Sequence, residues 1–296
     1  MNLTLIAIAF ITALGLKAPA NLVDSQKPVV SRQAEAATNS NVPIVTNATN
    51  LQLAAGSVLA IDATTGTVLY AKNSDQTRPI ASLTKIMTVL AVLKDHDPSD
   101  KITIPALSGY KPGEVIAKLV TGDTLTVKDL VAASLIPSDN DAADALAIST
   151  SGTKEKFYGK MNTIAKEWGL RNTTFASASG LQDAGNQSSA ADLATLARLG
   201  LYNKLFSELT ATKTMKITSE QGRVYTLSTT NDLLDGVRVI GLKTGYTPAA
   251  GECLVTRSVI NGHEVITVML GSRDRFGETA RLLDWLSNNV SWHTTN

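Results

Sequence analysis

Three short strings constrain this chain of 296 residues more than any other feature. They are Ser82-Leu83-Thr84-Lys85, Ser138-Asp139-Asn140 and Lys243-Thr244-Gly245, separated by intervals of 56 and 105 residues. The first string begins an apolar helical stretch that runs to residue 93, the second falls between two helical segments, and the third lies in a strand-like run. If the three strings act together, the fold must bring a helix start, a joint between helices and a strand to one place.

The order of the predicted elements favours an α+β fold. Strands are predicted at 56–62 and 67–71, helices at 82–93, 126–136, 141–149, 155–169 and 189–202, strands at 237–243, 252–259 and 264–271, and a last helix at 277–289. Asn261-Gly262 between the last two strands is a strong hairpin signal. We expect an antiparallel sheet built from 51–80 and 215–290, with a helical lobe at about 95–210 between its two parts.

The first 50 residues predict an export signal and a linker rather than part of the folded domain. An uncharged apolar run at 3–16 precedes Ala18-Pro19-Ala20, so residues 1–20 are expected to be an export signal. No Lys or Arg precedes the run, and an uncleaved N-terminal anchor is the alternative. Residues 21–50 are polar and lack an apolar period, which predicts a flexible linker; residues 291–296 are expected to be a tail. We therefore expect a periplasmic or otherwise extracytoplasmic protein that contacts a membrane only through an uncleaved N-terminus.

Composition excludes several classes of function. The 27 basic and 26 acidic side chains balance to a net charge of +1, which argues against nucleic acid as a partner. His96, His263 and His293 are far apart in sequence, and no H-E-x-x-H or C-x-x-C occurs, so we expect no metal and no cofactor. Cys253 is the only cysteine, and we interpret it as a buried core residue.

Ser82 and Lys85 are the candidate nucleophile and base. Residues three apart share one face of a helix, so Lys85 reaches the Ser82 hydroxyl. At a helix start, the backbone N–H of Ser82 is also a candidate half of an oxyanion hole. Ser151-Gly152-Thr153-Lys154 matches the same S-x-x-K pattern. The polar stretch that follows it, 155–160, instead predicts a solvated helix, whereas 86–93 is apolar enough to be central.

The other members of the three strings have complementary chemistry. Lys243 is a candidate for a second cation that helps to keep the base neutral. Asn140 is suited to orient the base and bind a substrate amide, and Ser138 to relay a proton to the leaving group. Thr244 offers a donor for a substrate carboxylate, and Gly245 lets a substrate backbone lie close to the strand edge. Such a set suits acyl transfer through a serine ester.

These residues resemble the superfamily of penicillin-binding proteins and serine β-lactamases. The match is best with the low-molecular-mass, serine-type D-alanyl-D-alanine carboxypeptidases, and it covers about 50–290. The stretches that carry the resemblance are 79–88, 174–175 with 180–181, 188–194, and 241–247 with 250–254. The resemblance implies a transpeptidase-like catalytic domain at 51–290, with a five-stranded antiparallel sheet flanked by helices. It also implies that Ser82 is acylated, that the N–H of Tyr246 completes the oxyanion hole, and that Arg275 is the substrate-site arginine before the last helix.

The implied activity is removal of the terminal D-Ala from peptidoglycan stem peptides, with β-lactams as covalent inhibitors and the cell wall as the place of action. No glutamate occurs between Glu167 and Glu208, which disfavours a class A β-lactamase because that class needs one to activate the deacylating water. The chain also ends soon after its predicted last helix, as in shorter family members, some of which are endopeptidases on peptidoglycan cross-links. Carboxypeptidase and endopeptidase therefore both stay open. A binding protein that kept the fold without catalysis is the remaining alternative.

Overall fold

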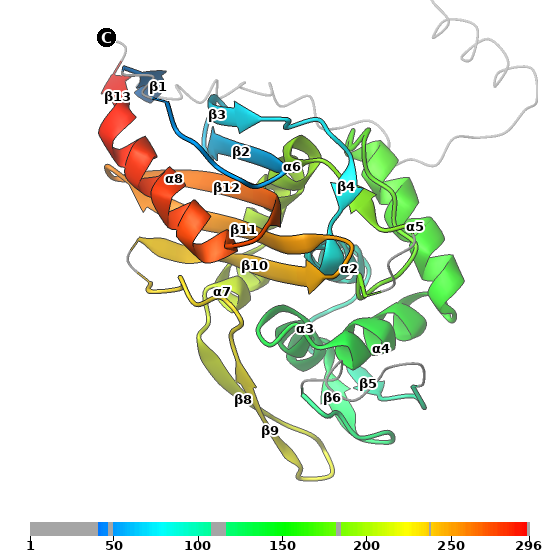
Figure 1. Cartoon of the computed structure of the whole chain (residues 1–296). Coiled ribbons are helices and arrows are strands. Elements are labelled where there is room, and N and C mark those ends of the chain that lie inside the picture. Colours follow the sequence, from blue (N-terminus) through cyan, green and yellow to red (C-terminus); the bar gives the residue numbers. More distant parts are fainter. Residues whose placement is uncertain (1–40, 47–49, 108–116, 182–184, 237, 295–296) are drawn as a thin grey trace, which may run out of the picture. The chain divides into compact units, whose positions relative to one another are not determined.

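A five-stranded antiparallel sheet organises the protein (Figure 1). Its strands are β2 (Ser57–Asp62), β3 (Val68–Lys72), β10 (Val239–Thr247), β11 (Gly251–Ile260) and β12 (His263–Ser272), in the order β10-β11-β12-β2-β3. The computed structural model describes residues 41–46, 50–107, 117–181, 185–236 and 238–294. The predicted export signal and residues 21–40 lie outside the described residues.

The sheet joins the two ends of the folded chain, as the sequence predicts. The pair formed by β12 and β2 runs from Val265 opposite Asp62 to Leu270 opposite Ser57. Asn261 and Gly262 connect β11 to β12 with φ values of +51° and +83°, the left-handed pair that a tight hairpin requires. The α+β prediction with a five-stranded antiparallel sheet is therefore confirmed.

Both faces of the sheet are covered by helices (Figure 1). Helix α8 (Arg275–Asn289) covers one face, where Leu282, Leu283 and Leu286 pack with apolar side chains of β2, β3 and β12. Helix α2 (Thr84–Leu93) belongs to the larger core on the other side, and all of its residues except Leu93 are buried. The apolar run after Lys85 thus becomes a central helix, which gives the first string a rigid support.

The helical lobe lies beside α2. It contains α3 (Val127–Leu135), α4 (Asn140–Ser151), α5 (Lys154–Glu167), α6 (Ala190–Leu201) and α7 (Lys204–Thr210). Thr126 and Asp129 form a capping box at the start of α3, and Asp139 caps α4 by accepting the N–H of Ala142 at 2.8 Å. The second string therefore spans the joint between α3 and α4. Within the described ranges, every helix is too short or too polar to cross a membrane.

The structure differs from the expected boundaries at both ends of the folded part. Residues within the expected linker form β1 (Asn41–Val45), which pairs in antiparallel register with β13 (Val290–Thr294), most of which lies in the expected tail. The folded unit is accordingly Asn41–Thr294 rather than 51–290. Pairing between segments about 250 residues apart leaves no local period in either one, so sequence patterns miss it.

In the described part of the chain, three further strand pairs lie outside the main sheet. They are β4 (Arg78–Pro79) with β7 (Gln187–Ser188), β5 (Lys101–Thr103) with β6 (Thr124–Thr126), and β8 (Thr214–Thr218) with β9 (Val224–Ser228). The last pair is a separate hairpin, although the sequence places 215–228 in the sheet. Its inner face, with Ile217, Tyr225 and Leu227, joins the core of the helical lobe instead.

Candidate active site

Ser82 is the middle residue of a 3-10 turn, η2 (Ala81–Leu83), that runs directly into α2. The turn is tight, because the N–H of Leu83 donates to the carbonyl of Ile80 at 3.1 Å and Ala81 has a φ of +48°. A left-handed alanine is a strained conformation of the kind that occurs at functional sites. Ala81 and Leu83 are buried and Ser82 is only partly so, which leaves the hydroxyl accessible at the start of a buried helix.

Lys85 connects Ser82 to the helical lobe. Its Nζ lies 2.9 Å from Ser82 Oγ, 2.7 Å from Asn140 Oδ1 and 2.7 Å from the carbonyl oxygen of Ser179. The two carbonyl oxygens can only accept hydrogen bonds. A neutral amine therefore uses its two N–H groups on Asn140 and Ser179, and its lone pair faces the O–H of Ser82.

The surroundings of Lys85 favour this neutral form. Its side chain is completely buried, and burial lowers the pKa of the Lys85 amine to about 7, against the opposing pull of the Asp139 and Asp144 carboxylates. The pKa of Lys243 is also well below its usual value, first because of burial and then because of the charges of Lys85 and Arg275. Burial, and not the charge of Lys243, is thus the main reason why Lys85 can serve as a base.

The third string lies on edge strand β10, beside Ser82. A Cβ on Gly245 would be 3.1 Å from the backbone nitrogen of Ser82 and 3.1 Å from the carbonyl oxygen of Ile80, closer than nearly all real Cβ contacts. Only glycine leaves room for the strand to approach the turn this closely. On the same strand, Lys243 donates its Nζ to the carbonyl of Thr244 at 3.0 Å.

Arg275 begins helix α8 and reaches back to β10. Its Nη1 donates to the carbonyl oxygen of Gly245 at 3.0 Å, and its backbone N–H donates to Glu252 at 2.8 Å. The guanidinium lies 4.7 Å from the centre of the Phe276 ring, within cation–π range. Arg275, the first residue of α8, therefore places a positive charge at the strand that carries Thr244.

The remaining sequence-predicted residues lie next to this cluster along the chain. Ser138 is 9% exposed, has a φ of +69°, and stands two residues before Asn140 at the joint between α3 and α4. Tyr246 follows Gly245 on β10, and the residue is 60% exposed. Thr244 is 4% exposed, and its hydroxyl oxygen lies 2.5 Å from that of Thr230.

Sequence reasoning gave no role to Ser179 and Thr230. Ser179 contributes a backbone carbonyl, and no residue type marks a useful carbonyl in a sequence. The signal that exists is its neighbour Gly180, which has a φ of +80° and on which a Cβ would be 2.0 Å from the carbonyl oxygen of Ala81. Thr230 follows β9 and carries no pattern that would single it out.

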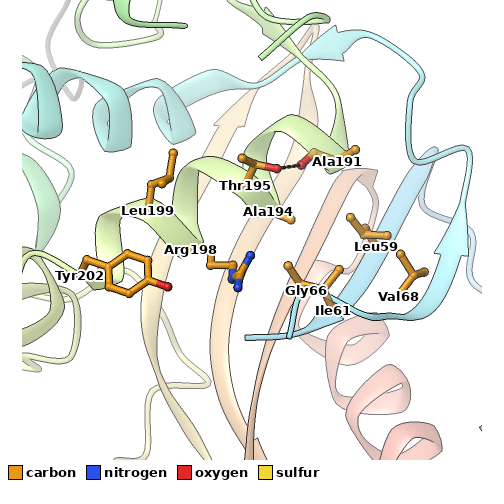
Figure 2. Close-up of a pocket in the computed structure, with 10 residues that line it drawn as sticks. All are labelled: Leu59, Ile61, Gly66, Val68, Ala191, Ala194, Thr195, Arg198, Leu199 and Tyr202. Carbon is orange, nitrogen blue, oxygen red and sulfur yellow. Dashed lines mark hydrogen bonds between the residues drawn. The ribbon is translucent and has the colours of Figure 1, made fainter. Parts of the chain in front are cut away.

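A cavity of about 370 Å³ lies elsewhere, between α6 and the hairpin of β2 and β3 (Figure 2). Apolar side chains such as Leu59, Ile61 and Leu199 line it. Its arginine, Arg198, donates Nε to the carbonyl of Ala63 at 2.8 Å. The cavity contains none of the sequence-predicted site residues, and it is separate from the cluster around Ser82.

Known proteins match the chain over most of the folded region. Residues 44–274 match the family described as D-alanyl-D-alanine carboxypeptidase, peptidase family S11. The chain is 34% identical over 81% of its length to D-alanyl-D-alanine carboxypeptidase DacF of Bacillus subtilis, and 33% identical over 81% to a D-alanyl-D-alanine endopeptidase of Escherichia coli. It spans 64% of the length of the first relative and 80% of the second.

A solved structure agrees with the fold. The ampicillin-bound form of penicillin-binding protein D2 from Listeria monocytogenes is similar with a TM-score of 0.70 and 32% identity, over 80% of this chain and 99% of that one. The family match covers more than half of the chain, and it includes Ser82, Lys85, Asn140 and the strand from Lys243 to Gly245. The chain therefore belongs to the serine-type D-alanyl-D-alanine carboxypeptidase family, the low-molecular-mass penicillin-binding proteins.

Proposed function

We propose that this protein is an exported D-alanyl-D-alanine carboxypeptidase that removes the terminal D-Ala from peptidoglycan stem peptides through an acyl-enzyme on Ser82. The observation that carries the proposal is the environment of Lys85 Nζ, which has two carbonyl acceptors at 2.7 Å and the Ser82 hydroxyl at 2.9 Å. This arrangement leaves the lone pair of a neutral amine only one useful direction, toward the Ser82 proton.

Acylation begins when the Lys85 amine takes the proton of Ser82 and Ser82 Oγ attacks the carbonyl carbon of the D-Ala-D-Ala bond. The carbonyl oxygen becomes an oxyanion, which the N–H groups of Ser82 and Tyr246 stabilise. The C–N bond then breaks, and the leaving amine receives the proton by way of Ser138. Water hydrolyses the ester, which releases the shortened peptide and restores the Ser82 hydroxyl.

The terminal carboxylate of the substrate is bound at β10. Thr244 donates its hydroxyl proton to that carboxylate, while the positive charge of Arg275 favours an anion at this strand. Asn140 binds a substrate amide with the side chain that also orients Lys85. The contact of Arg275 with the Gly245 carbonyl holds the guanidinium close to Thr244.

The same chemistry predicts that β-lactams acylate Ser82. A β-lactam presents a strained amide and a free carboxylate in place of the terminal dipeptide. In support, the related protein of Listeria monocytogenes has solved structures in ampicillin-bound and cefotaxime-bound forms. Labelling with a fluorescent penicillin therefore tests the proposal directly. Wild-type protein should become labelled, and Ser82→Ala should not; equal labelling of the two would remove Ser82 from the nucleophile role.

The second candidate is a D,D-endopeptidase that cleaves peptidoglycan cross-links. It is supported by the similarity to the endopeptidase of Escherichia coli, which is 33% identical over 81% of this chain. Purified protein incubated with a pentapeptide and with a cross-linked dimer separates the two activities by the masses of the products. Loss of one alanine from the pentapeptide with an intact dimer supports the carboxypeptidase, and conversion of the dimer to monomers supports the endopeptidase.

A further inference from the structure

We propose that Thr230 is a positioning residue, whose hydroxyl orients that of Thr244 so that Thr244 donates its proton to the substrate carboxylate. The proposal rests on the proposed function, because it assigns Thr230 a task in binding a peptide that ends in a free carboxylate. Thr230 lies outside the three strings and reaches the site from the turn that follows β9 (Val224–Ser228).

The argument starts from the 2.5 Å between the hydroxyl oxygens of Thr230 and Thr244. Each hydroxyl has one proton, so one of the two donates and the other accepts. If Thr244 donates to Thr230, the Thr244 hydroxyl proton is already in a hydrogen bond, and Thr244 cannot donate it to a carboxylate. If Thr230 donates, the Thr244 proton is available to the substrate, and the two bonds form a chain in which each strengthens the other. A bound carboxylate can only accept, and it therefore selects the second arrangement.

The backbone around Thr230 is fixed before any substrate arrives. The N–H of Thr229 donates to the carbonyl of Lys213 at 2.8 Å, and the N–H of Asn231 donates to the hydroxyl of Thr229 at 3.2 Å. Asn231 is buried, and its side-chain oxygen accepts the N–H of Leu233 at 3.1 Å. The turn thus holds the Thr230 hydroxyl at a fixed place, so little ordering remains to be done when the substrate binds.

The charge near Thr244 matches an anionic group. The amine of Lys243 contacts the Thr244 carbonyl, and the guanidinium of Arg275 contacts the carbonyl of Gly245, the next residue. The Arg275 guanidinium attracts a carboxylate, and one of its N–H groups is already engaged by the Gly245 carbonyl. A hydroxyl with a fixed direction adds a constraint on the angle at which the carboxylate binds, and Thr230 sets that direction.

The test compares acylation by benzylpenicillin, which has a free carboxylate, with acylation by its methyl ester, which lacks that charge. Thr230→Val keeps the shape of the side chain and removes the hydroxyl. We expect it to lower the second-order rate constant with benzylpenicillin about tenfold and to leave the rate with the methyl ester unchanged. Thr230→Ser should restore the wild-type ratio. Thr226→Val, an exposed threonine on β9, is the matched control and should behave as the wild type.

A double variant separates positioning from direct contact. If Thr230 acts through Thr244, Thr230→Val combined with Thr244→Val should acylate no more slowly than Thr244→Val alone. Additive losses, or equal losses with benzylpenicillin and its ester, overturn the proposal. Wild-type protein that is not acylated at all overturns the proposed function, and this inference with it. Wild-type acylation with an unchanged ratio in Thr230→Val overturns this inference alone.

Discussion

The Nζ atom of Lys85 lies 2.9 Å from the Oγ atom of Ser82, and both residues belong to one turn at the start of the buried helix α2. The distance is set by helix geometry, since residues three apart share a face. What makes the pair reactive is the burial of Lys85, which lowers the pKa of its amine to about 7. A lysine on the same turn in water would stay charged and could not accept the Ser82 proton.

Acylation should rise with pH through about 7. The base works only when the Lys85 amine is neutral, and its pKa of about 7 means that the neutral fraction grows as pH increases through that value. Below pH 6, the rate constant for acylation by benzylpenicillin should fall about tenfold for each pH unit. Rates measured between pH 5 and 9 in a constant-ionic-strength buffer check this. A rate that is flat across the range would show that another group activates Ser82.

Lys85→Ala should abolish acylation while the protein stays folded. Loss of a positioned general base costs about 10²–10⁴-fold in rate, so labelling by penicillin at pH 7 should fall below detection in minutes-long reactions. Lys94→Ala, just beyond α2, is the matched control, because the Lys94–Glu167 ion pair is half-exposed and contributes at most about 1 kcal/mol. Circular dichroism confirms folding of both variants. Retained acylation in Lys85→Ala would take the base role away from Lys85.

Gly245→Ala should damage the reaction more than the fold. The added methyl group would be 3.1 Å from the backbone nitrogen of Ser82, and β10 must move a few tenths of an ångström away from the nucleophile. Small displacements of this kind cost up to about 10²-fold in rate. Gly159→Ala is the control, since nothing lies within 4 Å of a Cβ there; it should gain about 0.5–1 kcal/mol of helix stability and acylate normally. Wild-type acylation by Gly245→Ala would contradict this account of the strand.

The parts of the fold that sequence predicts are those with a local cause. The Asn261-Gly262 turn, the capping box of α3 and the apolar run of α2 each depend on neighbours within a few residues, and each is present in the structure. The pairing of β1 with β13 has no such cause, because it joins segments about 250 residues apart. Local patterns alone therefore placed the ends of the folded unit several residues too far inward.

The same distinction between local and tertiary causes applies to the residues of the candidate active site. Residue types identify side chains that have chemistry of their own, such as Ser82 and Lys85, and the strings give their order. The Ser179 carbonyl that accepts from Lys85 is a backbone group, and every residue in the chain has one. Thr230 is one of many threonines until the fold sets its hydroxyl 2.5 Å from that of Thr244. Contacts that depend on tertiary structure need the structure to be found.

Cys253 should be inert toward alkylation in the folded protein. Its side chain is completely buried, and burial raises the pKa of the thiol to about 11, so the reactive thiolate is almost absent at neutral pH. Iodoacetamide at pH 8 should leave both the mass of the native protein and its labelling by penicillin unchanged. In guanidinium chloride the thiol should be modified completely. Rapid alkylation of the native protein would mean that β11 opens more often than a buried strand should.

Glu278 should be important for stability, because it links helix α8 to the segment that leads into β2. Its carboxylate is 1% exposed; one oxygen accepts the N–H groups of Ala54 and Ala55, the latter at 3.1 Å, and the other accepts the hydroxyl of Ser272. Glu278→Gln keeps the size but turns one acceptor into a donor. It should lower the free energy of unfolding by about 1–3 kcal/mol, measured from the urea midpoint.

The matched control lies on the same helix. The side chain of Asp284 is 65% exposed, and it pairs with Arg238 at 2.7 Å, so Asp284→Asn should change the free energy of unfolding by less than about 1 kcal/mol. Both variants should still be labelled by penicillin at 20 °C, because Glu278 and Asp284 act on stability and not on the reaction. If Glu278→Gln unfolds at the same urea concentration as the wild type, the buried carboxylate does not hold residues 54 and 55 against α8. Apolar packing of α8, through Leu282, Leu283 and Leu286, would then be what stabilises this contact.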